Sequence, residues 1–178
     1  MTLARTINDA ICGVSADVLA LLRRSGMRIA FAESCTGGLL ASALTHHPGA
    51  SEALEMSFVT YCDRAKNDIL GVPQQVLDAY TAVSAHTAAA MAEGAMVRSG
   101  ADIAVSVTGL AGPGGGTAGR PVGLVYIGIA GLGALAAYRC CFPGDRAAVR
   151  AQAALKALQL ARQRIMSSKD AADPAIDL

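Results

Sequence analysis

The segment IAVSVTG (103–109) constrains the fold more than any other, because it is a continuous run of apolar and small residues that ends in glycine. Uninterrupted runs of this kind are typical of strands that are buried on both faces of a sheet. A second short strand is predicted at MRIAFA (27–32). Each strand is followed by a loop rich in small residues, which predicts an α/β fold with its functional loops at the strand ends.

Helical spacing separates these strands. Ile7, Ile11, Val14, Val18 and Leu21 recur at helical intervals, and Ser25-Gly26 ends that helix. Two apolar runs joined by Gly131-Leu132-Gly133 predict an antiparallel hairpin. Strands interleaved with helices, plus one hairpin, predict a three-layer α/β/α sandwich with a mixed, mostly parallel sheet. The other predicted elements are helices at 39–47, 73 onward, 85–99 and 146–166, a short helix or turn at 63–71, and strands at 53–61, 123–130 and 134–142.

Composition bounds the class of protein. Of 178 residues, 53% are apolar, which is enough to build a core and excludes intrinsic disorder. The 15 basic and 14 acidic residues leave a net charge of +1, so there is no field to attract a nucleic acid or an anionic membrane. We predict a single domain over residues 1–166, followed by a polar tail over 167–178.

Cysteine and histidine usage argues against disulfides and metal ligation. No C-x-x-C spacing occurs, so we expect reduced thiols, no metal, no cofactor and a cytoplasmic location. Asn8, Asp9 and Asp17 stand where a signal peptide would need an apolar run. The most hydrophobic stretch begins at Gly123 and is interrupted by glycines. Its uninterrupted part is shorter than the about 20 apolar residues that a membrane-spanning helix needs. The five cysteines are Cys12, Cys35, Cys62, Cys140 and Cys141.

The loop after the first strand reads Glu33-Ser34-Cys35-Thr36-Gly37-Gly38. It places a hydroxyl group at a strand-to-helix turn, where free backbone N–H groups can hold an anion or an oxyanion. Ser34 is therefore a candidate nucleophile. The alternative is that Ser34 or Thr36 only caps the helix that follows.

The loop after the second strand, LAGPGGGTAGRPVG (110–123), is dominated by glycine. Glycine permits close approach of the backbone to a ligand and positive φ angles. No Lys-Ser/Thr pair follows, so it is not a P-loop, and a strand rather than a helix comes next. The loop predicts a ligand-binding segment, with a flexible surface loop as the alternative.

A serine nucleophile needs a base. The three histidines fall in segments predicted as helices, away from the two loops that follow the strands; they are His46, His47 and His86. A lysine serves as base if burial keeps it neutral, and Lys66 follows a strand end closely, whereas Lys156 and Lys169 do not. The alternative is a solvated lysine on a helix surface.

Several ordered motifs together resemble the C-terminal domain of the CinA proteins. They are AESCTGGLLASALT, VTYCDRAKNDILGV, AVSAHTAAAMAEGA, VSVTGLAGPGGGT and RPVGLVYIGIA, and the match runs from about residue 7 to residue 160. Stand-alone members of this family are nicotinamide-nucleotide amidohydrolases with an α/β/α fold. The resemblance implies hydrolysis of nicotinamide mononucleotide to nicotinic acid mononucleotide and ammonia, without a metal or cofactor.

The resemblance also implies roles for individual residues. The family's Ser-Lys pair falls on Ser34 and Lys66, which implies an acyl-enzyme mechanism. Tyr61 and Thr108 are expected to take part in catalysis by orienting Lys66 or by holding the carboxamide. Arg146 matches an arginine expected to hold the substrate phosphate together with the glycine loop. Backbone N–H groups near Gly37 and Gly38, or in the loop after Thr108, are expected to stabilise the oxyanion. Substrate contacts are expected at Thr36, Gly37, Gly38, Gly109, Ala111, Gly112 and Arg146.

The sequence departs from the family pattern just before the lysine, where Cys62 and Asp63 replace a small residue and an asparagine. Pairing of Asp63 with Lys66 would raise the pKa of the lysine and oppose its role as a base, whereas pairing with Arg64 would not. A non-catalytic nucleotide-binding module is therefore the alternative function, and Cys35 is the rival nucleophile.

The expected partner is a small pyridine nucleotide, with no nucleic acid and no membrane. Ala-rich helices and the apolar hairpin also predict a homodimer or a higher homo-oligomer.

Overall fold

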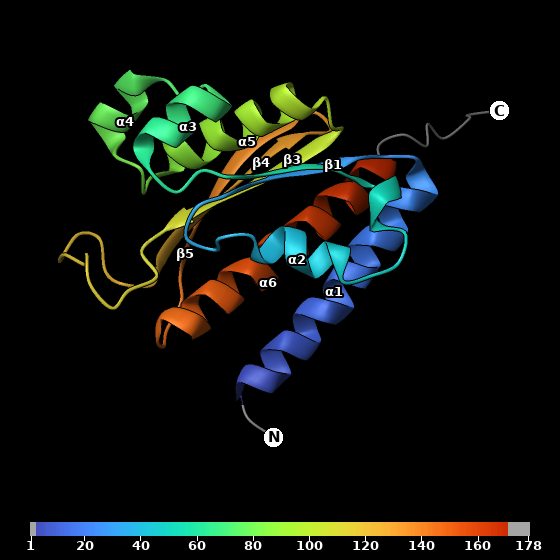
Figure 1. Cartoon of the computed structure of the whole chain (residues 1–178), viewed down its shortest axis with the longest axis horizontal. Coiled ribbons are helices and arrows are strands. Elements are labelled where there is room, and N and C mark those ends of the chain that lie inside the picture. Colours follow the sequence, from blue (N-terminus) through green and yellow to red (C-terminus); the bar gives the residue numbers. More distant parts are fainter. Residues whose placement is uncertain (1–2, 171–178) are drawn as a thin grey trace.

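Five strands form one sheet in the order β2-β1-β3-β4-β5 in the computed structural model, which describes residues 3–170 (Figure 1). β1 (Ile29–Glu33) lies between β2 (Leu54–Val59) and β3 (Ile103–Gly109), and both pairings are parallel. β4 (Leu124–Gly131) and β5 (Ala134–Cys141) form an antiparallel hairpin, and β4 is antiparallel to β3. The predicted mixed sheet is confirmed, and β4 runs against the direction of the other four strands.

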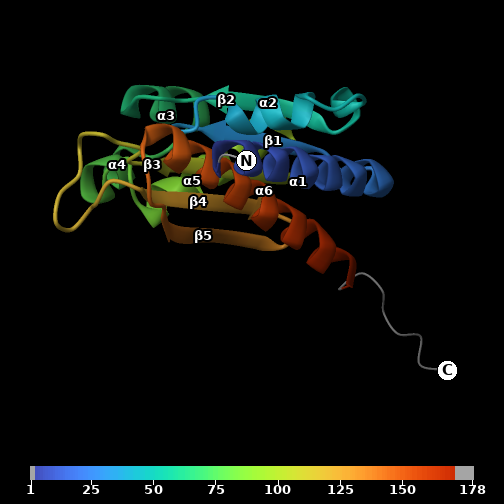
Figure 2. The same ribbon diagram turned by 90° about the horizontal axis from the view of Figure 1, so that it is seen from below.

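Helices cover both faces of this sheet (Figure 1). One layer contains α1 (Leu3–Ser25), α2 (Leu39–Thr45) and α6 (Arg146–Asp170). Figure 2 shows α1 and α6 side by side across the strands. The other layer contains α3 (Asp63–Leu70), α4 (Gln74–Tyr80) and α5 (Ala85–Ser99), and α5 packs directly on the strands. The three-layer α/β/α prediction is confirmed; a 3-10 helix, η1 (Ala50–Glu52), also precedes β2.

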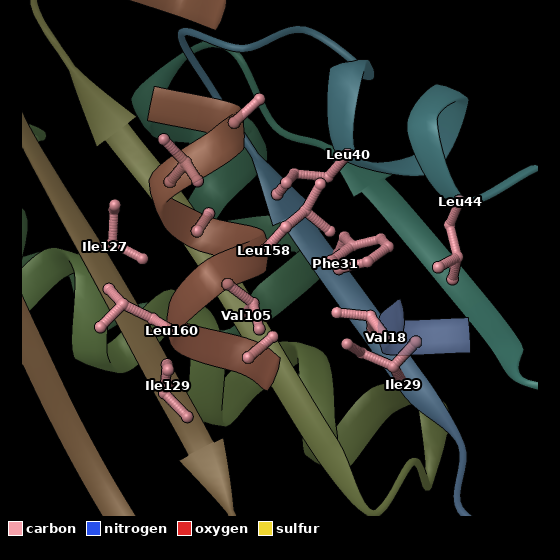
Figure 3. Close-up of a cluster of buried hydrophobic side chains, with 14 of the residues drawn as sticks. Val18, Ile29, Phe31, Leu40, Leu44, Val105, Ile127, Ile129, Leu158 and Leu160 are labelled. Atoms are coloured by element: carbon pink, nitrogen blue, oxygen red, sulfur yellow. The ribbon is translucent and has the colours of Figure 1, made fainter. Parts of the chain in front are cut away.

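The two faces of the sheet carry side chains of different size. Large aliphatic and aromatic residues fill the face under α1, α2 and α6, with Phe31 at the centre (Figure 3). The face under α5 carries small residues such as Ala30, Ala104 and Ser106. A Cβ atom at Gly128 would lie 2.3 Å from the carbonyl oxygen of Ala88, so α5 sits closer to the strands than any side chain there would permit.

Local signals in the sequence placed most of the element boundaries. Ser84 caps α5 by accepting the N–H of Thr87, as predicted. Asp145 likewise accepts the N–H of Ala148 at the start of α6. α6 continues to Asp170, beyond the predicted end at 166, and residues 171–178 of the predicted tail lie outside the described part of the chain.

The hairpin forms one edge of the sheet. Leu135 and Tyr138 of β5 are exposed there, and the predicted homo-oligomer stays a prediction. Between residues 3 and 170, no helix has the length and apolar character needed to cross a membrane.

Candidate functional site

The parallel strands β1, β2 and β3 end at the same edge of the sheet, and three candidate segments begin there. Ser34 follows β1, Thr60 and Tyr61 follow β2, and Thr108 lies at the end of β3. The backbone N–H of Ser34 donates to Val107, and that of Thr60 donates to Glu33. These two hydrogen bonds extend the pairing of the strands by one residue beyond β1 and β2. The backbone that carries Ser34 and Thr60 is therefore held by the sheet.

Ser34 and Lys66 meet at this edge. Lys66 lies on α3, and its Nζ is 3.3 Å from the Oγ of Ser34. The same Nζ donates to the carbonyl oxygens of Thr60 at 3.0 Å and Tyr61 at 3.4 Å. The lysine is 1% exposed and the serine 8% exposed, so the alternative of a solvated lysine is wrong.

Burial governs the ionisation of this amine. Desolvation lowers the pKa of Lys66 below its ordinary value of 10.5, while the negative charge of Asp63 and the nearby thiols of Cys62 and Cys35 act in the opposite direction. Asp63 makes no ion pair with Lys66 in the part of the chain that the structure describes. The alternative pairing of Asp63 with Arg64 is also absent from residues 3–170, where Arg64 pairs with Asp68.

Glu33, which the sequence analysis did not single out, holds the turn that carries Ser34. Its buried carboxylate accepts the backbone N–H groups of Gly38, Leu40 and Ala41 at the start of α2. Gly38 is the N-cap position and has no side chain to cap with, so the interpretation of Ser34 or Thr36 as the cap is wrong. Gly37 and Gly38 both have positive φ, which brings those N–H groups over the carboxylate.

The expected oxyanion donors at Gly37 and Gly38 are already occupied. The N–H of Gly37 donates to the carbonyl of Ser34, and that of Gly38 donates to Glu33. The two bonds hold the backbone of the turn in place, so these two N–H groups are not free to bind an oxyanion. The next N–H groups toward the nucleophile belong to Cys35 and Thr36, and among residues 3–170 neither donates to a carbonyl or a carboxylate.

Arg150, a second residue missed from the sequence, holds the same turn from outside. Its Nε donates to the carbonyl of Cys35 at 3.0 Å, and its Nη2 donates to the carbonyl of Thr36 at 2.7 Å. The guanidinium reaches across from α6, so no local sequence signal connects it to the turn.

Cys35, the rival nucleophile, is buried, with 6% of its surface exposed. Burial raises the pKa of its thiol to about 11, against a smaller opposing effect of Arg150. A thiol of this kind is protonated near neutral pH, whereas the nucleophile in cysteine chemistry is the thiolate. The geometry therefore favours Ser34.

Tyr61, Arg146 and Gly112 form a chain of contacts beside the pair. Arg146 donates to the phenol oxygen of Tyr61 at 2.9 Å and to the carbonyl of Gly112 at 2.8 Å. Arg146 thus ties the glycine loop to the segment after β2. Tyr61 orients Lys66 through its backbone carbonyl, while its phenol faces Arg146.

Thr108 is buried and donates its hydroxyl to the carbonyl of Ala82 at 2.7 Å. No bond from this hydroxyl to Ser34 or Lys66 is present among residues 3–170. Gly109, next in the chain, cannot carry a side chain without displacing neighbours, because its Cβ would lie 2.7 Å from the carbonyl oxygen of Leu124. Thr108 and Gly109 therefore fix the start of the glycine loop against its surroundings.

The histidines lie away from the Ser-Lys pair, but α2 ends at Thr45, so His46 and His47 follow this helix and are not part of it as predicted. His47 Nε2 is 2.8 Å from Ser15 Oγ, and His86 stacks on Tyr80 with ring centroids 3.7 Å apart. The described part of the chain contains no group of three His, Cys, Asp or Glu side chains that could hold a metal ion.

Comparisons with known proteins identify a family of similar chains. Residues 13–165 match the family model of the CinA C-terminal domain. A curated relative from Enterobacter agglomerans, named nicotinamide-nucleotide amidohydrolase PncC, is 44% identical over 87% of this chain and 95% of its own length. A putative competence-damage inducible protein of Caldicellulosiruptor bescii is 47% identical over 84% of this chain, which spans 36% of that longer protein.

Solved structures are similar as well. A CinA superfamily protein of Klebsiella pneumoniae has a TM-score of 0.85 at 34% identity and covers 88% of this chain and 98% of its own. The competence/damage inducible protein CihA of Agrobacterium tumefaciens has a TM-score of 0.84 at 38% identity and covers 90% and 96%. The chain therefore belongs to the CinA C-terminal domain family.

Proposed function

We propose that this protein is an amidohydrolase that converts nicotinamide mononucleotide and water to nicotinic acid mononucleotide and ammonia. The observation that carries the proposal is the 3.3 Å contact between the buried Nζ of Lys66 and the Oγ of Ser34. The name of the Enterobacter agglomerans relative, a nicotinamide-nucleotide amidohydrolase, supports the same reaction class. A serine beside a base of lowered pKa is the general arrangement for nucleophilic acyl transfer.

Lys66 acts as the base and then as the acid. In its neutral form it takes the Ser34 proton while the serine oxygen attacks the carboxamide carbon. The protonated lysine then gives this proton to the departing nitrogen, and ammonia leaves as the C–N bond breaks. Water enters, loses a proton to Lys66 and attacks the acyl-enzyme. Lys66 returns this proton to Ser34 as the ester bond breaks, and the carboxylic acid product loses its own proton to solvent and becomes the carboxylate. The carbonyl oxygens of Thr60 and Tyr61 hold the amine in line throughout.

The backbone N–H groups of Cys35 and Thr36 are our candidates for the oxyanion hole. They follow the nucleophile directly, as in other strand-to-helix turns that carry a serine nucleophile. Arg150 bonds to the carbonyl of Cys35, which belongs to the same peptide group as the N–H of Thr36. A guanidinium on that carbonyl polarises the peptide and strengthens the N–H as a donor. One such donor is typically worth about 2.7–4 kcal/mol in the transition state.

The substrate would lie between the turn and the glycine loop. The Oγ1 of Thr36 is buried without a protein partner among the described residues, so a substrate group or a water at this point would satisfy it. Gly109, Ala111 and Gly112 line the base of the loop as proposed contacts. Arg146 uses two of its five N–H donors on Tyr61 and Gly112 and stays a proposed substrate contact through the others.

The test is release of ammonia from nicotinamide mononucleotide by Ser34→Ala and Lys66→Ala. Each variant is expected to lose at least about a thousandfold in kcat, as when one member of a nucleophile–base unit is removed. Lys156→Ala, a lysine of α6 outside the pair, is the matched control and should retain the wild-type rate. A near wild-type rate in either of the first two variants, with folding verified by circular dichroism, contradicts the dyad.

A non-catalytic nucleotide-binding module is the second candidate, because the charge of Asp63 raises the pKa of Lys66 against the effect of burial. Calorimetric binding of nicotinamide mononucleotide without any release of ammonia by the wild-type protein would favour it.

A further inference from the structure

A cavity of about 410 Å³ lies between the start of α3, the segment 81–83 and the glycine loop. It adjoins the Ser-Lys edge of the sheet, because Asp63 on its wall stands on α3 just before Lys66. Ala82, also on its wall, accepts the hydroxyl of Thr108 at the end of β3. Hollows of similar size elsewhere border α1 or the packing of α3 against α5, away from the strand ends.

The cavity carries one negative and one positive side chain. Asp63 is exposed to it and has no ion pair in the described part of the chain. Arg120, from the glycine loop, lines another part of the wall and donates to the hydroxyl of Thr81. Two opposite charges that line one cavity without pairing with each other present a dipolar surface to whatever enters.

Backbone strain and hydrogen bonds shape the wall under Arg120. Thr81 has a φ of 65°, a left-handed backbone conformation that is unusual for a β-branched residue. Its carbonyl accepts the hydroxyl groups of Ser84 and Thr87 at the start of α5, and these bonds hold the strained conformation. The hydroxyl that Arg120 bonds is therefore fixed to the first turn of α5.

We propose that this cavity selects a zwitterionic pyridinium nucleotide, with Asp63 facing the positive ring and Arg120 facing the phosphate. The inference rests on the proposed function, since it names how the same site recognises its substrate. Nicotinamide mononucleotide carries a cationic ring and an anionic phosphate at its two ends, which match the two charges of the cavity. Asp63 is the one nearer Lys66 along the chain, so the ring end, which bears the carboxamide, is directed to the nucleophile.

The same charge favours release of the product. Hydrolysis places a carboxylate beside the pyridinium ring, next to Asp63. Like charges at short range repel, so the product binds more weakly than the substrate although the two have nearly the same shape. Asp63 is thus assigned as a specificity-determining residue.

Calorimetry with Ser34→Ala, which cannot turn over, tests the assignment. The probes are nicotinamide mononucleotide, its dihydro form with a neutral ring, and nicotinic acid mononucleotide. Adding Asp63→Asn should weaken binding of the cationic substrate about three- to fivefold, the size of an exposed charge pair, and leave the dihydro form unchanged. The same substitution should tighten binding of nicotinic acid mononucleotide. Arg120→Gln should weaken all three probes by a similar factor, because all three carry the phosphate.

Asp68→Asn is the matched control, since it removes the same charge from α3 outside the cavity, where Asp68 pairs with Arg64. It should leave the ratio of the affinities unchanged. The inference is overturned if Asp63→Asn changes the affinities for the cationic and neutral rings equally or not at all. If the wild-type enzyme releases ammonia but Asp63→Asn changes the affinities for both rings equally or not at all, only this inference is contradicted. Charge-selective binding without ammonia release contradicts only the proposed hydrolysis.

Discussion

The turn 33–38 and the glycine loop 110–123 leave the same end of the sheet, yet they are held very differently. The turn is fixed from both sides, by Glu33 below α2 and by Arg150 from α6. The glycine loop is bonded at its base through Leu110 and by Arg146, and farther out Arg120 donates to Thr81, while residues 113–121 are exposed. We infer that the two segments have different roles. The rigid turn positions the nucleophile, and the less restrained glycine loop encloses the substrate.

Removing the carboxylate of Glu33 tests the rigid side and should have the largest effect. Glu33→Ala leaves the N–H groups of Gly38, Leu40 and Ala41 without their acceptor in a buried place. We expect the free energy of unfolding to fall by about 3 kcal/mol or more, since each bond to a charged group is worth about 1.5–3 kcal/mol. Chemical denaturation measures this loss.

Glu33→Gln is the control for that experiment, because it keeps one acceptor oxygen at the same place. It should be intermediate in stability between the wild type and Glu33→Ala. Equal stability of Glu33→Ala and the wild type would show that the turn does not depend on this carboxylate.

Arg150 tests whether the rigidity of the turn serves catalysis. Arg150→Gln removes the charge that bonds the carbonyls of Cys35 and Thr36. We expect kcat for ammonia release to fall about 10- to 100-fold with little change in KM, because the oxyanion develops only in the transition state. Arg150→Lys should restore part of kcat. A rise in KM with unchanged kcat would instead assign Arg150 to substrate binding.

Replacing one glycine by alanine in each segment should change stability by different amounts in the turn and in the loop, and this effect is smaller than those above. Gly38 has a φ of 95°, so Gly38→Ala should cost about 1–2 kcal/mol of stability through strain alone. Gly114 has open space around its Cβ position and no positive φ, so Gly114→Ala should stay within about 0.5 kcal/mol of the wild type. Equal losses of stability, measured by thermal unfolding, would contradict the difference between turn and loop.

The fold and the reactive pair could be predicted from the sequence because their signals are local. Continuous apolar runs located β1 and β3, and Ser84 and Asp145 marked helix starts. The Ser34–Lys66 pair followed from the residue types at strand ends together with the family resemblance, and the structure brings the two side chains together.

The supports of the pair could not be predicted, because they depend on contacts between distant parts of the chain. Arg150 lies on the last helix and reaches a turn near the beginning of the sequence. Glu33 belonged to the noted motif, but its capping role requires the backbone of α2 to fold back over the end of β1. Thr108 was expected to orient Lys66 or to hold the carboxamide. Its hydroxyl bonds Ala82 in the segment before α5, and its contact with the substrate stays a prediction.

The pH dependence of catalysis tests whether the two regions are coupled. Asp63 borders the cavity beside the glycine loop, and its charge also acts on Lys66, the general base beside the turn 33–38. Burial lowers the pKa of Lys66, and Asp63 partly opposes that effect. The base must be neutral, so kcat/KM should rise as the pH rises through the pKa of Lys66. In Asp63→Asn the opposing charge is gone, the pKa of Lys66 falls further, and the rising limb should move to lower pH. Asp68→Asn, five residues along α3, should leave the rising limb at the same pH. A limb that moves to higher pH in Asp63→Asn, or does not move, would mean that the titrating group is not Lys66 or that the two regions are not electrostatically coupled.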